Sequence, residues 1–153
     1  MHKDFSQFIE LLNSNKVKYV VIGGYAVSFY AIPRYTKDLD VLIETSPANV
    51  HKLLKTIDAF GLSSLNLTVA DFSYPNTMIQ FGYEPVRIDI LTSIKGVCWH
   101  QIWENKYTAC FGLSKINFIG LEELIKNKKA THRKLDLLDA VNLMKTKRKL
   151  ARS

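Results

Sequence analysis

Two short clusters of residues in this chain are suited to hold a phosphate beside a metal ion. Gly23 and Gly24 end one apolar run, and Asp38 and Asp40 open the next. A third acidic residue, Asp89, lies inside a later apolar run. Carboxylate oxygens suit hard cations such as Mg²⁺, which proteins commonly bind through carboxylates and substrate phosphates together. The pattern therefore indicates an enzyme that acts on a phosphate-bearing substrate.

Side-chain alternation predicts that the acidic residues share one face of a sheet. Successive strand residues point to opposite sides, so Asp38 and Asp40 face the same way. Asp89 shares a side with Arg87 and Leu91, so neighbouring strands could bring the three carboxylates together. Close carboxylates raise one another's pKa unless a cation lies between them. We therefore expect Mg²⁺, or Mn²⁺, at this face, where two such ions could clamp the oxygens of a phosphoryl displacement.

The two glycines supply the phosphate-binding half of the pattern. Glycine permits a turn whose backbone approaches a phosphate closely, and the helix that follows presents free N–H groups and a positive dipole end. Taken alone, Gly-Gly before a helix is more often a plain turn. The prediction rests on the order: strand, Gly-Gly, helix, a strand with Asp-x-Asp, then a strand with one Asp. The sequence lacks both the P-loop motif and the Gly-x-Gly-x-x-Gly of dinucleotide-binding proteins.

The elements that position these residues alternate between helical and strand periodicity. Two apolar runs on either side of Gly82 predict an antiparallel hairpin. The last helix has an apolar stripe of Leu135, Leu138, Val141 and Met144, the pattern of a helix that faces a core. The predicted helices cover 4–14, 25–31, 50 to about 61, 121–128 and 133–147, and the predicted strands cover 17–22, 38–43, 65–69, 78–81, 86–91, 107–111 and 116–119.

Length and composition bound the class of protein. The chain has 153 residues, 47% of them hydrophobic, which suits one soluble domain over 1–153 with a single core. No apolar stretch approaches the roughly 20 residues that cross a bilayer, and the N-terminus lacks a signal-peptide core. We therefore expect a cytoplasmic protein without a membrane partner. Cys98 and Cys110 form no Cys-x-x-Cys pair, so we expect buried, reduced thiols and neither a disulfide framework nor a zinc site.

Positive charge gathers in the last third of the chain. The net charge is +7, and the segments 126–134 and 145–152 carry the densest basic stretches. Such a field attracts a nucleotide or an RNA. A solvated helix face with a frayed basic tail explains the same charge equally well, so charge alone leaves both interpretations open.

The order of the motifs resembles the DNA polymerase-β-like nucleotidyltransferase superfamily. Its members carry a Gly-Gly or Gly-Ser turn, an acidic pair and a third acidic strand residue, matched here within 23–27, 33–43 and 87–91. The C-terminal residues that extend the resemblance are Leu124, Ile125, Lys128, Arg133, Asp136 and Asp139. The similarity is greater to the small bacterial and archaeal branch of AbiEii-type proteins. It implies a minimal nucleotidyltransferase: an α/β fold with a mixed, mostly antiparallel sheet flanked by helices, and a C-terminal helical segment at about 121–147.

The resemblance implies a role for each matching residue. Asp38 and Asp40 would coordinate the two metal ions, and Asp89 would complete the site and help to activate the acceptor hydroxyl. Gly23 and Gly24 would contact the triphosphate.

Four further residues are nucleotide-binding candidates. Arg34 and Thr36 lie just before the acidic pair, where they could contact phosphate or brace the carboxylates. A structural bridge to an aspartate explains Arg34 equally well. Lys128 and Arg133 would reach the nucleotide phosphates from the helical segment, and surface charge is the alternative for both.

The implied reaction moves a nucleoside monophosphate from an NTP to an acceptor hydroxyl on an RNA such as tRNA, a protein or a small molecule, and releases pyrophosphate. The AbiEii resemblance implies a toxin–antitoxin setting, with an antitoxin, another partner protein or a second copy of the chain as partner. Two alternatives stay open: a non-catalytic nucleotide-binding or partner-binding module of the same fold, and a basic RNA-binding protein. The presence of all three aspartates argues against the first, and steep salt dependence of binding would favour the second.

Overall fold

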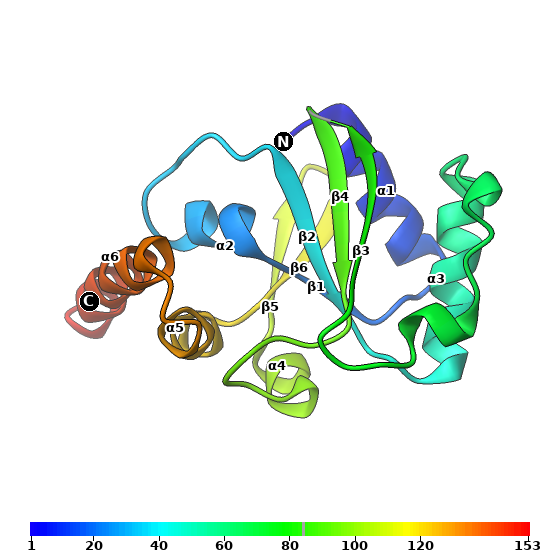
Figure 1. The fold of residues 1–153 in the computed structure, drawn as a ribbon. Coiled ribbons are helices and arrows are strands. Elements are labelled where there is room, and N and C mark those ends of the chain that lie inside the picture. The colour runs from blue at the N-terminus through cyan, green and yellow to red at the C-terminus, as the bar shows by residue number, and fades with distance from the viewer. Residues whose placement is uncertain (84) are drawn as a thin grey trace.

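In the computed structural model, which describes residues 1–83 and 85–153, a mixed β-sheet lies between two groups of helices (Figure 1). The strands within these residues are β1 (Tyr19–Ile22), β2 (Asp38–Ile43), β3 (Met78–Tyr83), β4 (Val86–Leu91), β5 (Tyr107–Phe111) and β6 (Ser114–Phe118). The α-helices are α1 (Lys3–Ser14), α2 (Gly23–Tyr30), α3 (Pro47–Ala59), α4 (Trp99–Asn105), α5 (Leu121–Ala130) and α6 (Lys134–Ala151). Two 3₁₀ turns, η1 (Ser63–Leu65) and η2 (Val69–Phe72), follow α3.

The strand order in the sheet is β3-β4-β2-β1-β6-β5. β1 pairs antiparallel with β2 and parallel with β6, and β2 pairs parallel with β4. The two outer pairs, β3 with β4 and β5 with β6, are antiparallel hairpins. The predicted fold class, a mixed and mostly antiparallel sheet flanked by helices, is confirmed. Glu84, in the predicted turn of the first hairpin, lies outside the described residues.

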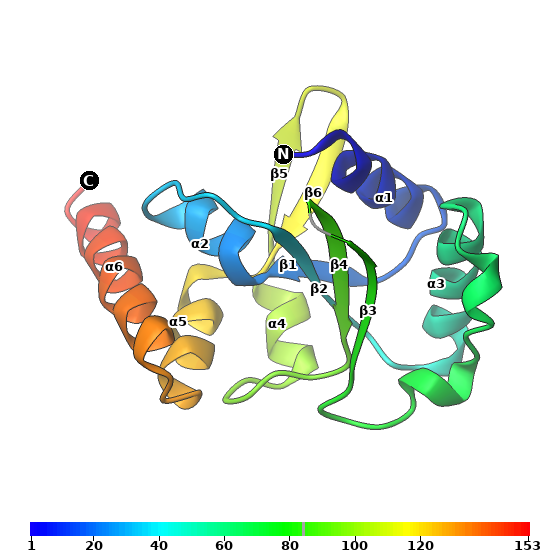
Figure 2. The ribbon, with the colours of Figure 1, turned by 45° about the horizontal axis from the view of Figure 1, so that its top comes forward.

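Helices cover both faces of the central strands. Figures 1 and 2 show α1 and α3 on one side of the sheet, and α2, α5 and α6 on the other. β1 is buried along its whole length because it lies between these layers. In β2, Leu39 and Val41 are buried on one face while Asp38 and Asp40 stay partly accessible on the other. The strand therefore carries its hydrophobic residues into the core and its carboxylates toward α2.

Two sequence predictions about local structure are wrong, and one helix has no predicted counterpart. The alternation at 65–69 does not make a strand, because Thr68 and Asp71 form a capping box that starts η2 instead. Cys98 and Cys110 are exposed rather than buried. Helix α4 was not predicted at all. Its tryptophans, Trp99 and Trp103, are half-buried and stack on each other with ring centroids 5.5 Å apart.

The final helix turns a different face inward from the one that its apolar stripe predicts. Leu135, Leu138 and Val141 are exposed, and of the stripe only Met144 packs against the core. The residues that α6 buries are Asp136, Asp139, Ala140 and Leu143. Both aspartates pair with the buried Lys128, and these charge-assisted contacts favour the burial of this face. Within the described residues no helix is long and apolar enough to cross a bilayer.

Candidate active site

The N-terminus of α2 lies directly against the first acidic strand. The helix begins at Gly23 with no intervening turn, and Gly23 has a φ of +67°, in the left-handed region that favours glycine. A Cβ placed on Gly23 would overlap the Asp40 Oδ2 atom and lie 2.9 Å from Asp40 Cγ. Gly24 is similarly confined, since a Cβ there would lie 2.8 Å from Thr36 Cγ2. Both glycines are therefore required for close approach of the helix start to β2.

The pairing of β2 with β4 brings the predicted acidic residues together. In this parallel register Asp38 lies opposite Arg87, and Asp40 lies opposite Asp89. Paired residues in a sheet project to the same face. The Arg87 Nη2 donates to Asp38 Oδ2 at 2.6 Å, and its Nε lies 3.6 Å from Asp89 Oδ1. The guanidinium thus bridges two of the three carboxylates.

The carboxyl groups of Asp40 and Asp89 share a hydrogen bond, and this contact alters both pKa values. Burial is the largest cause that raises the pKa of Asp40, and the bond to Asp89 and repulsion from Asp89 and Asp38 raise it further, to about 7. Burial also raises the pKa of Asp89, although the bond to Asp40 and the charge of Arg87 oppose the change. Near neutral pH the pair therefore holds a proton that a cation would displace.

Two buried oxygens at this face support a cation site. Among the described residues, Asp38 Oδ1 and Asp89 Oδ1 are buried and accept no hydrogen bond. Oxygen ligands of this kind suit Mg²⁺ or Mn²⁺. The described residues contain no group of three or more His, Cys, Asp or Glu side chains already spaced to hold a metal ion. The three aspartates do not form such a group because the guanidinium of Arg87 lies between Asp38 and Asp89 and supplies the positive charge there.

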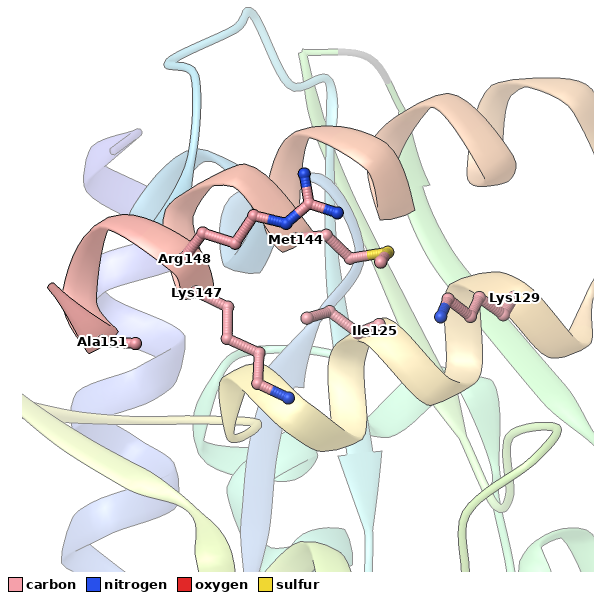
Figure 3. Close-up of a pocket in the computed structure, with 6 residues that line it drawn as sticks. All are labelled: Ile125, Lys129, Met144, Lys147, Arg148 and Ala151. Carbon is pink, nitrogen blue, oxygen red and sulfur yellow. The ribbon is translucent and has the colours of Figure 1, made fainter.

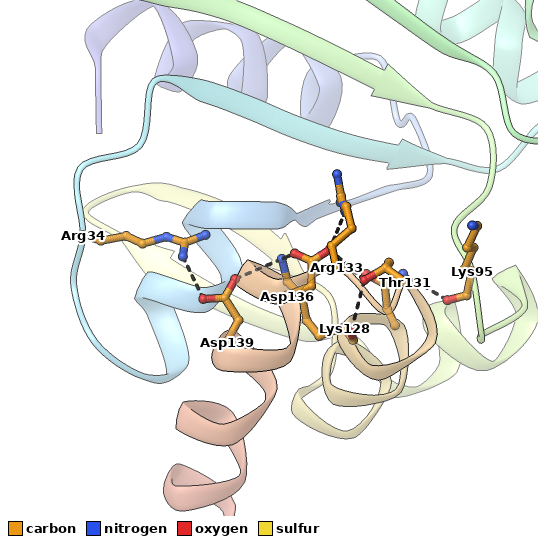
Figure 4. A network of polar contacts seen from close by, with 8 residues as sticks. Arg34, Lys95, Lys128, Thr131, Arg133, Asp136 and Asp139 are labelled. Carbon is orange, nitrogen blue, oxygen red and sulfur yellow. Dashed lines mark hydrogen bonds and ion pairs between the residues drawn. The ribbon is translucent and has the colours of Figure 1, made fainter.

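A network of charges centred on the buried Lys128 connects the C-terminal helices to the loop that precedes β2 (Figure 4). The Lys128 Nζ donates to Asp136 Oδ1 at 3.0 Å and lies 3.3 Å from Asp139 Oδ2. Asp139 Oδ1 in turn accepts from Arg34 Nη1 at 2.8 Å. The charge of Lys128 also lowers the pKa of Asp40, as the last of the causes that act on it. The network therefore holds the Lys128 ammonium between two carboxylates of α6.

The four nucleotide-binding candidates occupy different environments. Lys128 is only 7% exposed, so it is not a surface charge. Arg34 forms the structural bridge to an aspartate, through Asp139. Thr36 donates to the Arg34 carbonyl at 3.3 Å and lies beside Gly24. The Arg133 side chain is 76% exposed and bonds to Asp136, so it lies at the rim of the network.

Three contributors to this site were not identified as site residues from the sequence. Arg87 alternates with Asp89 on β4, and that spacing was a usable signal. Gln80 bonds to Asp89 from the opposite position on β3, which only the hairpin register reveals. Asp139 belongs to the C-terminal part of the resemblance, where it is expected to hold basic side chains in place, and it does pair with Lys128. Its bond to Arg34, 105 residues away in the sequence, follows from no local pattern.

Asp136 makes the buried network sensitive to acid. Burial raises the pKa of Asp136, but bonds from Thr131, Lys128 and Arg133 outweigh it and leave the pKa lowered. A lowered folded-state pKa stabilises the fold above the unfolded value of about 3.9, and the contribution disappears as pH falls through the folded value. We expect Asp136→Asn to lose about 3 kcal/mol of unfolding free energy at pH 7, the cost of breaking a buried pair.

Urea unfolding at pH 7 and at pH values below about 4 measures this difference, which should shrink in acid. Glu122→Gln is the matched control, because Glu122 pairs with Lys147 at an exposed position. That substitution should change stability little. An Asp136→Asn protein that is as stable as wild type at pH 7 would contradict the role of the network.

Comparison with known proteins places this geometry in a family. The family model described as "Nucleotidyl transferase of unknown function (DUF2204)" matches residues 1–152. A solved structure of the lincosamide antibiotic adenylyltransferase LnuA, with lincomycin bound, has a TM-score of 0.57 to this chain. The two chains are 13% identical, and the similarity covers 94% of this chain and 96% of LnuA. No curated protein has a significantly similar sequence. The shared fold is therefore that of a nucleotidyltransferase.

Proposed function

This chain belongs to the family of nucleotidyl transferases of unknown function (DUF2204), and from that premise we propose that it moves a nucleoside monophosphate from an NTP to an acceptor hydroxyl in a metal-dependent reaction. The observation that carries the proposal is the contact between Asp40 and Asp89 at the N-terminus of α2. A helix N-terminus attracts phosphate, and a carboxyl pair that retains a proton near neutral pH is suited to exchange it for a cation.

Each element of the site has a task in this reaction. Asp38, Asp40 and Asp89 would hold Mg²⁺ or Mn²⁺, after Asp38 releases the guanidinium of Arg87. A bound metal ion would supply charge neutralisation at the phosphates and lower the pKa of the acceptor hydroxyl. The N–H groups at the start of α2, at Gly23 and Gly24, would bind the triphosphate.

The proposed reaction is an in-line displacement at the α-phosphorus of the NTP. The acceptor oxygen attacks the α-phosphorus, and the bond between that phosphorus and the oxygen bridging to the β-phosphate breaks. Asp89 accepts the proton of the acceptor hydroxyl, and pyrophosphate leaves with the bonding electrons. The charge of Lys128 lowers the pKa of Asp40, and in the proposed reaction its ammonium would stabilise negative charge on the phosphates. Arg34 and Asp139 would hold that ammonium in position rather than contact the substrate.

The proposed acceptor is a small hydroxyl-bearing molecule. LnuA is an adenylyltransferase of lincosamide antibiotics, and the similarity covers nearly the whole of both chains. Because LnuA acts on a small molecule and the two chains match over nearly their whole lengths, a small-molecule acceptor is proposed for this chain as well. An RNA or protein acceptor, and a toxin–antitoxin role within the AbiEii-type branch, stay predictions that rest on the sequence resemblance.

Transfer of label from an NTP tests the proposal. Purified protein would be incubated with Mg²⁺ and each NTP, labelled at the α- or the γ-phosphate, together with small alcohols, RNA and carrier protein as acceptors. We expect the α-label to appear on an acceptor and the γ-label to appear in pyrophosphate. Metal-dependent NTP binding in calorimetry without any transfer would favour the non-catalytic alternative. Binding of RNA alone, weakening steeply with salt, would favour the RNA-binding one.

A further inference from the structure

The outer face of α6 combines exposed leucines with exposed basic residues. In its N-terminal half, Leu135, Leu138 and Val141 are 60%, 57% and 49% exposed. In its C-terminal half the outward basic residues are Lys145, Arg148 and Lys149, and Arg152 follows directly after the helix. The acidic residues of this helix, Asp136 and Asp139, both point inward to the charge network. The outer face is therefore apolar at one end and cationic at the other.

A pocket between α5 and α6 borders this face (Figure 3). Its volume is about 300 Å³, and Ile125 and Met144 supply its apolar surface. Lys129, Lys147 and Arg148 line the pocket, and because Lys147 already pairs with Glu122, Lys129 and Arg148 are the cations that a partner's carboxylate would meet. Figure 3 shows these three basic side chains around the two apolar ones. An apolar side chain could enter the pocket while a neighbouring carboxylate meets the basic rim.

We propose that the outer face of α6 and this pocket form a docking surface for an acidic amphipathic helix of a partner protein. Leucines at helical spacing suit a helix that lays its apolar side along a groove. The cationic half requires acidic residues on that partner, because complementary charge fixes its direction and register. The pocket accepts one apolar anchor, and buried anchors of this kind carry most of an interface's binding energy.

The charges disfavour two other occupants of the same surface. A second copy of the chain would bring an equally basic helix against this one, within a protein whose net charge is +7. The phosphates of an RNA would complement the lysines and arginines, but RNA is bound through positive charge and aromatic stacking, so the exposed leucines would make no favourable contact with it. An acidic amphipathic helix is the occupant that satisfies both halves of the surface. This inference is independent of the proposed reaction, since the surface lies on the side of α6 that faces away from Lys128.

Methionine methyl NMR tests the proposal directly. The chain has three methionines, of which Met144 lies in the pocket, whereas Met78 is on β3 and Met1 is terminal. The probe is a designed helical peptide with a leucine stripe flanked by glutamates. Two comparison peptides replace the glutamates by lysines or the leucines by serines. A short RNA hairpin is the fourth probe.

We expect the leucine–glutamate peptide to shift the Met144 methyl signal saturably and to leave Met1 and Met78 unchanged. Leu138→Glu should weaken that binding by about tenfold or more, since both apolar contact and charge complementarity are lost. Leu113→Glu, the same change at a fully exposed residue of the β5–β6 turn, should leave the affinity unchanged. Peptide binding that survives Leu138→Glu overturns the proposal. Equal binding of the serine peptide or the RNA also overturns it. A Met144 shift that appears without peptide as the protein concentration rises would show self-association through this surface and overturns it as well. Absence of any shift at millimolar peptide is a further contradiction.

Discussion

Asp40→Asn is expected to lower the rate of nucleotidyl transfer about a thousandfold while making the metal-free protein more stable at neutral pH. The rate falls because an amide cannot neutralise a cation, and loss of one charge-stabilising group at a reaction centre costs up to about three orders of magnitude. The stability gain follows from the carboxyl pair. The pKa of Asp40 is raised to about 7, first by burial and then by Asp89, so ionised Asp40 is unfavourable in the fold.

The pH dependence of that gain has a defined sign. A carboxyl whose folded-state pKa is raised loses stability as pH rises from the unfolded pKa, about 3.9, to the folded value. Asparagine resembles the protonated form and avoids this loss. The gain should therefore grow between about pH 4 and pH 7 and then level off at no more than about 4 kcal/mol.

Label transfer and thermal unfolding in metal-free buffer measure the two effects. Asp58→Asn is the control, because Asp58 is an exposed residue of α3. It should change neither activity nor stability. An Asp40→Asn protein that transfers label at the wild-type rate would show that the carboxyl pair is not catalytic. One that is less stable than wild type at pH 8 would show that the pair is a structural contact.

Gly23→Ala should lower transfer by about a hundredfold, because a displacement of about 1 Å in a reacting group can cost that much. The added methyl group would overlap Asp40 Oδ2, and the rigid start of α2 leaves the carboxylate to move instead. Backbone strain at a φ of +67° should cost a further 1–2 kcal/mol of stability, about the usual penalty of the left-handed conformation.

Gly112→Ala separates these two causes. Gly112 has a φ of +63°, close to that of Gly23, but a Cβ there meets nothing within 4 Å. It should show the same backbone penalty with full activity. Comparison of chemical unfolding and transfer rates for both variants is the measurement. Equal loss of activity in the two would mean that stability, and not the position of Asp40, limits transfer.

The sequence predicted the acidic face well because strand alternation is a local rule. Asp38 and Asp40 are separated by one residue, and the register of β2 with β4 places Asp89 opposite Asp40 as parity requires. The helix after Gly23 and the hairpin of β3 and β4 follow from equally short-range signals. The catalytic and metal-binding roles of the three aspartates are predictions that await experiment.

The charge network was less accessible to prediction because it depends on distant partners. The stripe of Leu135, Leu138 and Val141 predicts a helix packed through its leucines. The structure buries Asp136 and Asp139 instead, because the buried Lys128 pairs with both of them. The periodicity of α6 alone shows neither the buried lysine nor its pairing with these aspartates. Because the aspartates face inward, the leucines are exposed, and this exposure is the basis for the proposed docking surface.

The anomalous scattering of Mn²⁺ in crystals grown with a non-hydrolysable NTP tests the metal-dependent site most directly. We predict a manganese peak in contact with Asp38, Asp40 and Asp89, the triphosphate at the N-terminus of α2, and Arg87 released from Asp38. A nucleotide bound elsewhere, or one bound at α2 with no manganese peak and with Arg87 still bonded to Asp38, would contradict the assignment.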